Sequence, residues 1–498
     1  NYILHFMEGY MKKQSFKKII SIFISSVLSV NALSLTSLAE EVKISIPLQE
    51  SEIAEEENRK EAQYISGDFG YNILDDGSIG IVSYTGTASS LVIPSEIDGK
   101  KVTAISGWRA FYNCTTLVSV VIPEGVVSIG KSAFEDCSNL IKITIPDSVT
   151  SIECLAFCGC TNLVSITIPE GVTVISGSLF AECTSLLNVN IPENVTLIDD
   201  AAFRDCKNLT KISLPDSIVS INDITFSGCE SLTNITIPDN VTYIGDWAFR
   251  NCKNLTNIQI PEKVTYIGEK AFDGCISLSH ITIPDSVTST GAYTFQGCTN
   301  ITSVEIPCGL SSISLGMFED CTSLTTVVIP DNIVSIGNMA FSWCESLTNI
   351  TIPDSVVSIG ASAFSSCKSL TSISIPDSIS VISSATFAGC INLKNVSLPN
   401  SINSIGEGAF SSCQSLKSIT IPDSVITIGD GVFSYCYDLM CIEIPDSVQT
   451  LGEEAFMHCY SLIDVTLSEN LTTIKDSTFS YCKALKKIKI PDSVTFIA

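Results

Sequence analysis

The chain has 498 residues, of which 45% are hydrophobic and 16% are charged, and its 53 acidic and 27 basic side chains give a net charge of −26. This negative charge disfavours nucleic acid and anionic membrane surfaces as partners, because both are polyanions. Only three histidines are present, which leaves little material for acid–base or metal chemistry, so we expect a binding protein without a cofactor rather than an enzyme.

The N-terminal region has the order of a secretory signal peptide. Met11 is followed by Lys12, Lys13, Lys17 and Lys18, then by an apolar run over 19–28 and by the small residues around Ser37-Leu38-Ala39. The run is too short to span a membrane. We therefore predict a signal peptide over 11–39, secretion or display at the cell surface, and no membrane span after its removal. Residues 1–10, which precede Met11, are interpreted as a non-native upstream extension.

An acidic linker and a cap are expected next. Residues 40–63 are polar and acidic, which is typical of a solvated linker. Two strand-like runs, Tyr71–Leu74 and Ile79–Tyr84, flank Asp75-Asp76-Gly77 and predict a β-hairpin with an Asp-Gly turn. Pro94 then opens an atypical unit that is six residues longer than those that follow. Together, residues 64–116 are expected to cap the core of the region downstream.

A 23-residue period governs residues 117–498. Proline recurs at this interval from Pro123 to Pro491, with Ser468 in place of one proline. Phenylalanine follows each proline by eleven residues, cysteine by fourteen and leucine by seventeen. Seventeen of the 21 cysteines and seventeen of the 22 phenylalanines fall on this lattice, so these residues belong to the architecture rather than to one site.

One unit shows how such a repeat folds. Ile350 and Ile352 alternate with polar residues, as in a half-buried strand, and Pro353 ends its ladder. The apolar residues of the segment 363–370 lie three or four apart, which predicts a short helical or 3₁₀ turn. Stacked units bury what one unit cannot. The fold class predicted is a β-rich α/β repeat solenoid: a right-handed coil or horseshoe with a continuous parallel sheet, short helical turns opposite the sheet, and an N-terminal hairpin cap.

The unit L-x-x-I-x-I-P-x-x-V-x-x-I-G-x-x-A-F-x-x-C-x-x-L resembles the BspA-type leucine-rich repeat of bacterial surface proteins, which also occurs in some parasitic protists. The segment from Leu347 to Leu370 is a near-perfect copy, and the similarity covers residues 117–498. It implies a leucine-rich-repeat solenoid and surface display or adhesion, and it provides no catalytic residues to transfer. Because the chain stops at Ala498, seven residues into a unit, we expect the natural protein to continue.

The cysteine column has two interpretations. Neighbouring Cα atoms about 4.8 Å apart would fall within the range for disulfides, roughly 4.4–6.8 Å, and secretion permits oxidation. Side chains stacked in register point in parallel, however, and their spacing from phenylalanine places them in the core, which favours small buried hydrophobes. The four cysteines outside the column are Cys154, Cys158, Cys308 and Cys441. Cys158-Gly-Cys160 is reminiscent of a metal motif, but no histidine is near it, and we expect no metal site.

The residue after each proline is acidic in fifteen of seventeen units, with Cys308 and Asn400 as the exceptions. Turn chemistry, in which each carboxylate bonds its own backbone, is the favoured explanation. A row of Ca²⁺ sites is the alternative, although no multi-carboxylate loop occurs within one unit.

Two surfaces are candidates for binding. The positions two and four residues before each proline should form an exposed, polar sheet face, with Asn349 and Thr351 as examples; generic solubility is the alternative explanation. The second candidate is aromatic clustering, because exposed Tyr and Trp are favoured at interfaces, although chance drift or contact with a neighbouring domain would also explain it. The candidate ligand-binding residues are Tyr435, Tyr437, His458, Tyr460, Tyr481, Tyr243, Trp247, Tyr266 and Tyr293.

The function predicted is that of a monomeric, secreted or cell-surface, adhesin-like binding protein for an extracellular protein or polysaccharide. The alternative is a structural spacer, or a non-catalytic module of a larger surface or glycan-degrading protein. Catalysis is disfavoured because His280 and His458 lie about seven coils apart, on the order of 34 Å at the spacing of strands. No phosphate loop, nucleophile elbow or metal motif is present.

Overall fold

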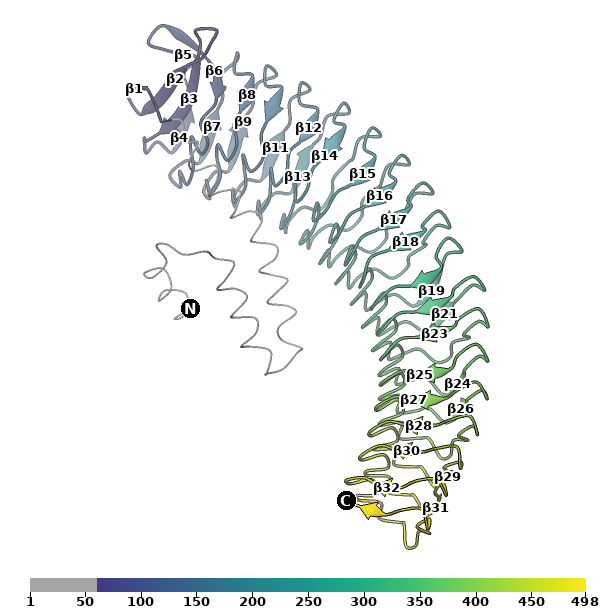
Figure 1. The fold of residues 1–498 in the computed structure, drawn as a ribbon. Coiled ribbons are helices and arrows are strands. Elements are labelled where there is room, and N and C mark those ends of the chain that lie inside the picture. Colours follow the sequence, from purple (N-terminus) through teal and green to yellow (C-terminus); the bar gives the residue numbers. More distant parts are fainter. Residues whose placement is uncertain (1–60) are drawn as a thin grey trace. The chain divides into compact units, whose positions relative to one another are not determined.

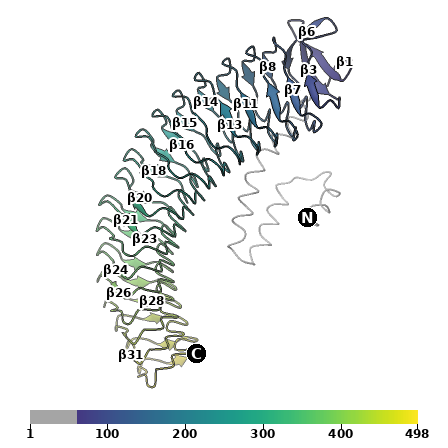
Figure 2. The same ribbon diagram turned by 180° about the vertical axis from the view of Figure 1, so that it is seen from behind.

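The computed structural model describes residues 61–498. The predicted upstream extension, the signal peptide and all but the last residues of the linker lie outside the described residues. Residues 62–498 form one compact unit, in which the coils stack one after another along a curved axis (Figure 1; seen from behind in Figure 2). The predicted solenoid is confirmed.

The N-terminal hairpin is also confirmed, and it has one more strand than expected. Strands β1 (Tyr64–Ser66), β2 (Phe69–Ile73) and β3 (Ile79–Tyr84) pair antiparallel in sequence order. At the turn, the Ser78 N–H donates to the Asp76 carboxylate at 2.9 Å. Strand β3 then pairs parallel with β6 (Lys100–Ile105), which joins the hairpin to the coils. The six additional residues of the first unit form a second small hairpin, between β5 (Glu96–Ile97) and β6.

Each coil contributes up to two short strands, one before and one after its proline. The pre-proline strands are β4 (Ser90–Val92), β7 (Ser119–Val121), β9 (Lys142–Thr144), β11 (Ser165–Thr167), β13 (Asn188–Asn190), β19 (Ser303–Glu305), β21 (Thr326–Val328), β24 (Ser372–Ser374), β26 (Asn395–Ser397), β29 (Cys441–Glu443) and β31 (Asp464–Thr466). The post-proline strands are β8 (Ser128–Ile129), β10 (Ser151–Ile152), β12 (Val174–Ile175), β14 (Leu197–Ile198), β15 (Ser220–Ile221), β16 (Tyr243–Ile244), β17 (Tyr266–Ile267), β18 (Ser289–Thr290), β20 (Ser312–Ile313), β22 (Ser335–Ile336), β23 (Ser358–Ile359), β25 (Val381–Ile382), β27 (Ser404–Ile405), β28 (Thr427–Ile428), β30 (Thr450–Leu451), β32 (Thr473–Ile474) and β33 (Phe496–Ile497).

The strands of successive coils pair in parallel and in register, so that equivalent residues stack. Ser165 pairs with Asn188, and Tyr243 pairs with Tyr266, one repeat later in each case. The ladders are interrupted, however, rather than forming the continuous sheet predicted: a seven-stranded sheet joins the hairpin to β8 and β10, and the other sheets have two to four strands. Strands of two or three residues form few ladder bonds, and the proline beside them has no N–H to donate.

The segment around each phenylalanine is not helical, and the prediction of helical or 3₁₀ turns there is wrong: no helix occurs within residues 61–498. The residues nine and thirteen positions after each proline have left-handed φ angles, as at Ser362 (57°) and Ser366 (58°). The N–H groups of Ser362, Phe364 and Ser366 donate to carbonyls of the next coil, at 2.6–2.9 Å. A helix would keep these bonds within its own segment. Successive turns explain the three-residue spacing equally well.

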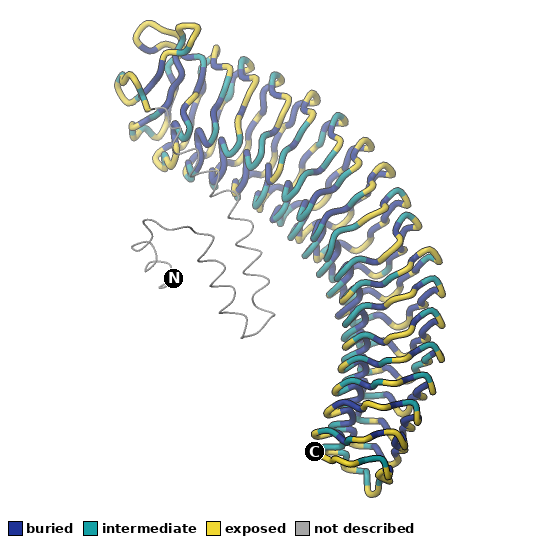
Figure 3. The backbone as a smooth tube through the Cα atoms, viewed as in Figure 1, coloured by how far each residue is buried: buried dark blue, intermediate teal, exposed yellow. Residues whose placement is uncertain are grey.

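The core is a column of phenylalanine rings that runs through the stack. Figure 3 marks along the backbone which residues are buried. Neighbouring rings from Phe111 to Phe479 lie parallel, with centroids 4.8–5.9 Å apart. The ring centroid of Tyr84 in the hairpin lies 5.2 Å from that of Phe111, and the ring centroid of Phe69 lies 5.2 Å from that of Tyr84. The hairpin therefore extends the aromatic column and covers its first ring, as expected of a cap.

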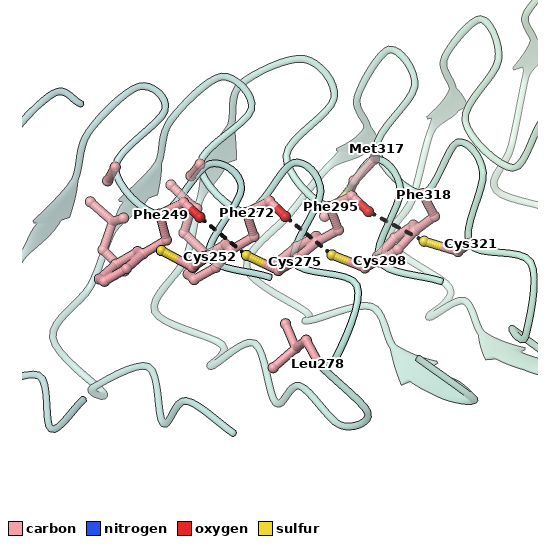
Figure 4. Packing of buried hydrophobic residues seen from close by; sticks show 14 of the residues in the cluster. Phe249, Cys252, Phe272, Cys275, Leu278, Phe295, Cys298, Met317, Phe318 and Cys321 are labelled. Carbon is pink, nitrogen blue, oxygen red and sulfur yellow. Dashed lines mark hydrogen bonds between the residues drawn. The ribbon is translucent and has the colours of Figure 1, made fainter. Parts of the chain in front are cut away.

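The lattice cysteines from Cys137 to Cys459 are buried beside this column, and Cys114 and Cys482 at its ends are partly buried. The thiol of each buried one donates to the phenylalanine carbonyl of the preceding coil, as from Cys275 to Phe249 at 3.1 Å (Figure 4). The bond recurs with nearly constant length, for example from Cys367 to Phe341 at 3.3 Å. Cysteine is thus both a small hydrophobe and a hydrogen-bond donor that satisfies a buried carbonyl.

Candidate binding surface

The residues two and four positions before each proline form an exposed surface, which we call the strand face. The alternation of a strand places these side chains outward and the intervening one in the core: Ser372 and Ser374 are exposed, whereas Ile373 is buried. Most of the strand face consists of Asn, Ser and Thr, which offer both hydrogen-bond donors and acceptors. The predicted polar face is therefore present, and it extends over many coils.

Four hollows lie over the strand face. One of them, the neutral hollow, has a volume of about 470 Å³ and spans three coils without a charged side chain in its lining. Its polar lining residues are Asn349, Thr351, Ser372, Ser374, Asn395 and Ser397.

The roomiest of the four, which we call the central hollow, has a volume of about 650 Å³. Its lining has more apolar than polar surface, and it includes three prolines and Val328, whose side chain is exposed. Its titratable side chains are Glu262, His280, Asp285, Glu305 and Cys308.

The remaining two hollows lie at the C-terminal coils. One, of about 450 Å³, contains Cys441, Glu443 and Asp464, and the other, of about 320 Å³, pairs acidic side chains with Lys487 and Lys489. The charge of the strand face therefore changes along the stack, while its geometry repeats.

The structure brings the five predicted aromatic residues of the last coils together, in the turn segments. His458 stacks between Tyr435 and Tyr481, with ring centroids 4.7 and 4.4 Å away. Tyr437 stacks on Tyr460 at 5.1 Å, and the Tyr460 hydroxyl lies 3.0 Å from Nδ1 of His458. Because the rings cover one another, this cluster presents mainly ring edges and hydroxyl groups, and few free ring faces on which a sugar could stack.

The other predicted cluster divides into two groups. Tyr243 and Tyr266 stack at 5.3 Å on the post-proline strands, and their hydroxyls donate to Asp223 and Asp246. Burial, reinforced by the neighbouring carboxylates, raises the pKa of both phenols. This pair is thus engaged in internal contacts.

Trp247 and Tyr293 lie in the turn segments instead, nine residues after their prolines. The ammonium group of Lys270, from the coil between them, lies 5.4 Å from the Tyr293 ring centroid. The indole N–H of Trp247 is buried and finds no hydrogen-bond partner among the described residues.

All 21 cysteines fall within the described residues, and all are free thiols. Burial raises the pKa of Cys137 and Cys390 to about 12, so at neutral pH these groups remain protonated donors rather than nucleophiles. The interpretation of the column as buried hydrophobes is confirmed. Of the cysteines outside the column, Cys308 and Cys441 are exposed, and each lines a hollow of the strand face.

The acidic residues after the prolines act differently from the prediction. Where bonds are formed, the carboxylate accepts from the next coil rather than from its own backbone: Asp285 accepts from the Cys308 N–H at 2.7 Å, and Asp446 from the Glu469 N–H at 2.8 Å. Because the coils stack in register, the backbone N–H of the next coil lies within hydrogen-bond distance of this carboxylate. Within residues 61–498, no group of three His, Cys, Asp or Glu side chains is arranged to hold a metal ion.

One cluster was missed by the sequence argument. The guanidinium carbon of Arg109 lies 4.8 Å from the Trp108 ring centroid and 4.4 Å from that of Tyr112, and Arg109 pairs with Glu135 at 3.2 Å. Trp108, Arg109 and Tyr112 lie in the atypical first unit, at positions where the repeat allows any residue, and their large side chains were the available signal. No feature of the sequence indicated where the four hollows of the strand face lie.

The two histidines of the described residues serve different regions: His280 lines the central hollow, and His458 belongs to the aromatic stack. The part of the chain that the structure describes contains no helix long and apolar enough to cross a membrane.

Comparison with known proteins gives one family. A model described as "BspA type Leucine rich repeat region (6 copies)" matches residues 104–233, 219–338, 311–410 and 380–498. A leucine-rich repeat protein from Bacteroides ovatus is 30% identical, with 87% of this chain and 99% of that chain covered and a TM-score of 0.55. A leucine-rich cell surface protein from Faecalibacterium prausnitzii is 27% identical, with 81% and 94% covered and a TM-score of 0.35. No curated protein matches the chain.

Proposed function

Because this chain belongs to the BspA-type leucine-rich repeat family, we propose that it acts outside the cell as an adhesin-like protein that binds an extracellular protein or glycan through its strand face. The observation that carries this proposal is the position of the hollows: four of them open on one exposed face whose side chains donate and accept hydrogen bonds. Export would use the basic and apolar segment of residues 11–39.

The composition of the face supports binding over catalysis. A broad array of hydroxyl and amide groups can form many weak contacts with an extended ligand, and its summed contacts can give specificity without one dominant residue. The C-terminal aromatic cluster is a second candidate contact region, because Tyr481 and Tyr460 keep substantial exposure, 61% and 36%.

A spacer is the alternative function, favoured by the uniformity of the stack. Seventeen phenylalanine rings in register would form a stiff rod whether or not its surface binds anything. A spacer, however, requires only solubility of its strand face, so its function should not respond to substitutions there.

The test is a binding screen of the full chain on an array of matrix proteins, mucins, and neutral and acidic polysaccharides. The strand-face variant is Asn349→Ala with Ser372→Ala and Asn395→Ala, and the comparison variant changes Tyr435, Tyr437, Tyr460 and Tyr481 to Ser. A ligand that the first variant loses and the second retains supports the proposal. The reverse result would place binding on the aromatic cluster, and a complete absence of ligands would favour the spacer.

A further inference from the structure

The central hollow is one of the parts of the strand face where the repeat pattern changes. Most of the face consists of Asn, Ser and Thr, but here, as at the C-terminal coils, it carries titratable side chains, His280 and Glu305. Cys308 occupies a position that is acidic in nearly every other coil, and Gly309 replaces the usual Ser or Asn.

Gly309 follows Cys308, a lining residue of this hollow, in the turn after Pro307. A Cβ atom there would lie 2.2 Å from the carbonyl oxygen of Asp285 and 2.4 Å from that of Val287, closer than any side chain allows. In a neighbouring coil, the equivalent Ser286 instead donates its hydroxyl to the Val264 carbonyl at 2.7 Å. The turn after Pro307 therefore approaches the preceding turn more closely than a serine would permit.

The charge of the hollow is one-sided. Glu262, Asp285 and Glu305 are among its lining residues, whereas no Lys or Arg is. Asp285 already accepts the Cys308 N–H, but Glu262 and Glu305 are exposed at the rim. Val328 lies beside Glu305 in the next coil, on the side away from Glu262, and its exposed side chain provides an apolar surface.

A long cationic side chain matches this combination. Lys and Arg lay an apolar stem along apolar surface and keep the charged head at a polar rim, and a charged donor forms stronger hydrogen bonds with a carboxylate than a neutral one does. A neutral sugar would leave the carboxylates without charge compensation, and an acidic one would be repelled. One exposed ion pair contributes little, so useful affinity requires a segment with several basic residues.

We propose that the central hollow docks a basic, extended peptide segment of a partner protein, with one Lys or Arg side chain lying over Val328 and its cationic head at Glu305, and a second basic side chain of the segment at Glu262. The inference rests on the proposed function, because it assumes that the strand face is the binding surface. It commits the ligand to a protein rather than a glycan.

The test measures binding of a fluorescein-labelled nonapeptide of alternating Lys and Ser to the full chain, by fluorescence anisotropy at low and at raised salt. The corresponding Glu–Ser peptide is the charge control. The variant is Glu262→Gln with Glu305→Gln. The matched control, Glu170→Gln with Glu193→Gln, removes the same charge from exposed positions that line none of the four hollows. We expect about a tenfold weaker affinity for the first pair, or roughly 1.4 kcal/mol, and less than a twofold change for the control.

Cys308 gives a second readout, because it is exposed and lines the hollow. Saturating Lys–Ser peptide should slow its alkylation by iodoacetamide in the native protein but not in the double variant, while the Glu–Ser peptide should have no effect. Equal losses of affinity in both charge variants would assign binding to the net charge of the chain, and would overturn the inference, as would alkylation of Cys308 at an unchanged rate.

The failure of this inference can be told apart from failure of the proposed function. Array ligands that are lost with the Asn349, Ser372 and Asn395 substitutions, together with a Lys–Ser peptide affinity that is unchanged in the Glu262→Gln, Glu305→Gln variant, would refute only the basic-segment site. If neither array ligands nor peptides bind the native chain, both proposals are wrong.

Discussion

The phenylalanine–cysteine column and the strand face are built from the same 23-residue unit, but the unit fixes the residue type in the column and not on the strand face. In the column, the same two residues recur in coil after coil, and Phe341 and Cys344 have no exposed surface. On the strand face, the side chain changes from coil to coil, from Asn349 to Ser372 to Asn395, while the backbone stays in register. The comparison teaches that packing determines residue identity where side chains interlock, and leaves the outward positions free to acquire specificity.

Alkaline pH should affect the buried column most. Burial raises the pKa of Cys137, Cys390 and Cys436 to about 12, whereas a thiol of the unfolded chain titrates near 8.5. Above that pH the unfolded state binds fewer protons than the native state, so stability is full below about pH 8.5 and is lost as the pH rises toward 12. Each such thiol should lower the free energy of unfolding by about 1.4 kcal/mol per pH unit over that range.

The measurement is the midpoint of urea unfolding, monitored by circular dichroism at pH values between 7.5 and 10. Cys390→Ala should reduce the slope, since it removes one titrating thiol. A midpoint that stays constant from pH 8.5 to 10 would contradict the prediction.

Truncating one ring of the column is the next largest perturbation. Phe341 stacks on Phe318 and Phe364 at 5.7 and 5.6 Å, and Phe341→Ala should destabilise the surrounding coils by about 3–5 kcal/mol, because a cavity remains. Hydrogen exchange would locate the loss in the neighbouring coils, since each coil contacts only its neighbours. Phe496, which is 60% exposed, provides the control: Phe496→Ala should change stability by less than about 0.5 kcal/mol. Equal effects would show that the column is not the source of stability.

The aromatic cluster of the last coils should show an intermediate effect. His458 has a left-handed φ of 61° and stacks between Tyr435 and Tyr481. His458→Asn keeps a residue that tolerates this conformation and removes the ring, so a loss of roughly 1–2 kcal/mol is expected from two aromatic contacts. The urea midpoint measures it, with Ser412→Asn at the equivalent position of an upstream coil as the control. An unchanged midpoint would mean that the rings do not stabilise one another.

Substitution on the strand face should have the smallest effect on stability and the clearest effect on binding. Asn349→Ala and Asn395→Ala each remove an exposed side chain, and unfolding free energies should change by less than about 0.5 kcal/mol. Surface plasmon resonance against a ligand found in the array screen should nevertheless show weaker binding. A loss of stability larger than 1 kcal/mol, by the same principle, would mean that these positions also support the fold.

Much of the fold follows from the chain alone. The 23-residue period places Phe341, Phe364 and Phe387 in equivalent positions, and a coil that cannot bury its own apolar side must stack on its neighbours. The Asp75-Asp76-Gly77 turn likewise predicts the hairpin locally. The turn segment was predicted wrongly because a spacing of three residues fits helices and successive turns alike, and only the bonds between coils, such as Phe364 to Thr386, decide between them.

The sequence by itself thus determined the coil, its register and its buried columns, because these depend on a pattern repeated many times over. Only the tertiary structure decided where the surface is hollow and which side chains meet there. Glu262 and Glu305 are 43 positions apart in the chain, and they line one cavity because three coils stack beside one another. The repeat pattern sets this stacking, but the outward residues that it brings together differ from coil to coil, so the pattern itself does not indicate where a cavity forms.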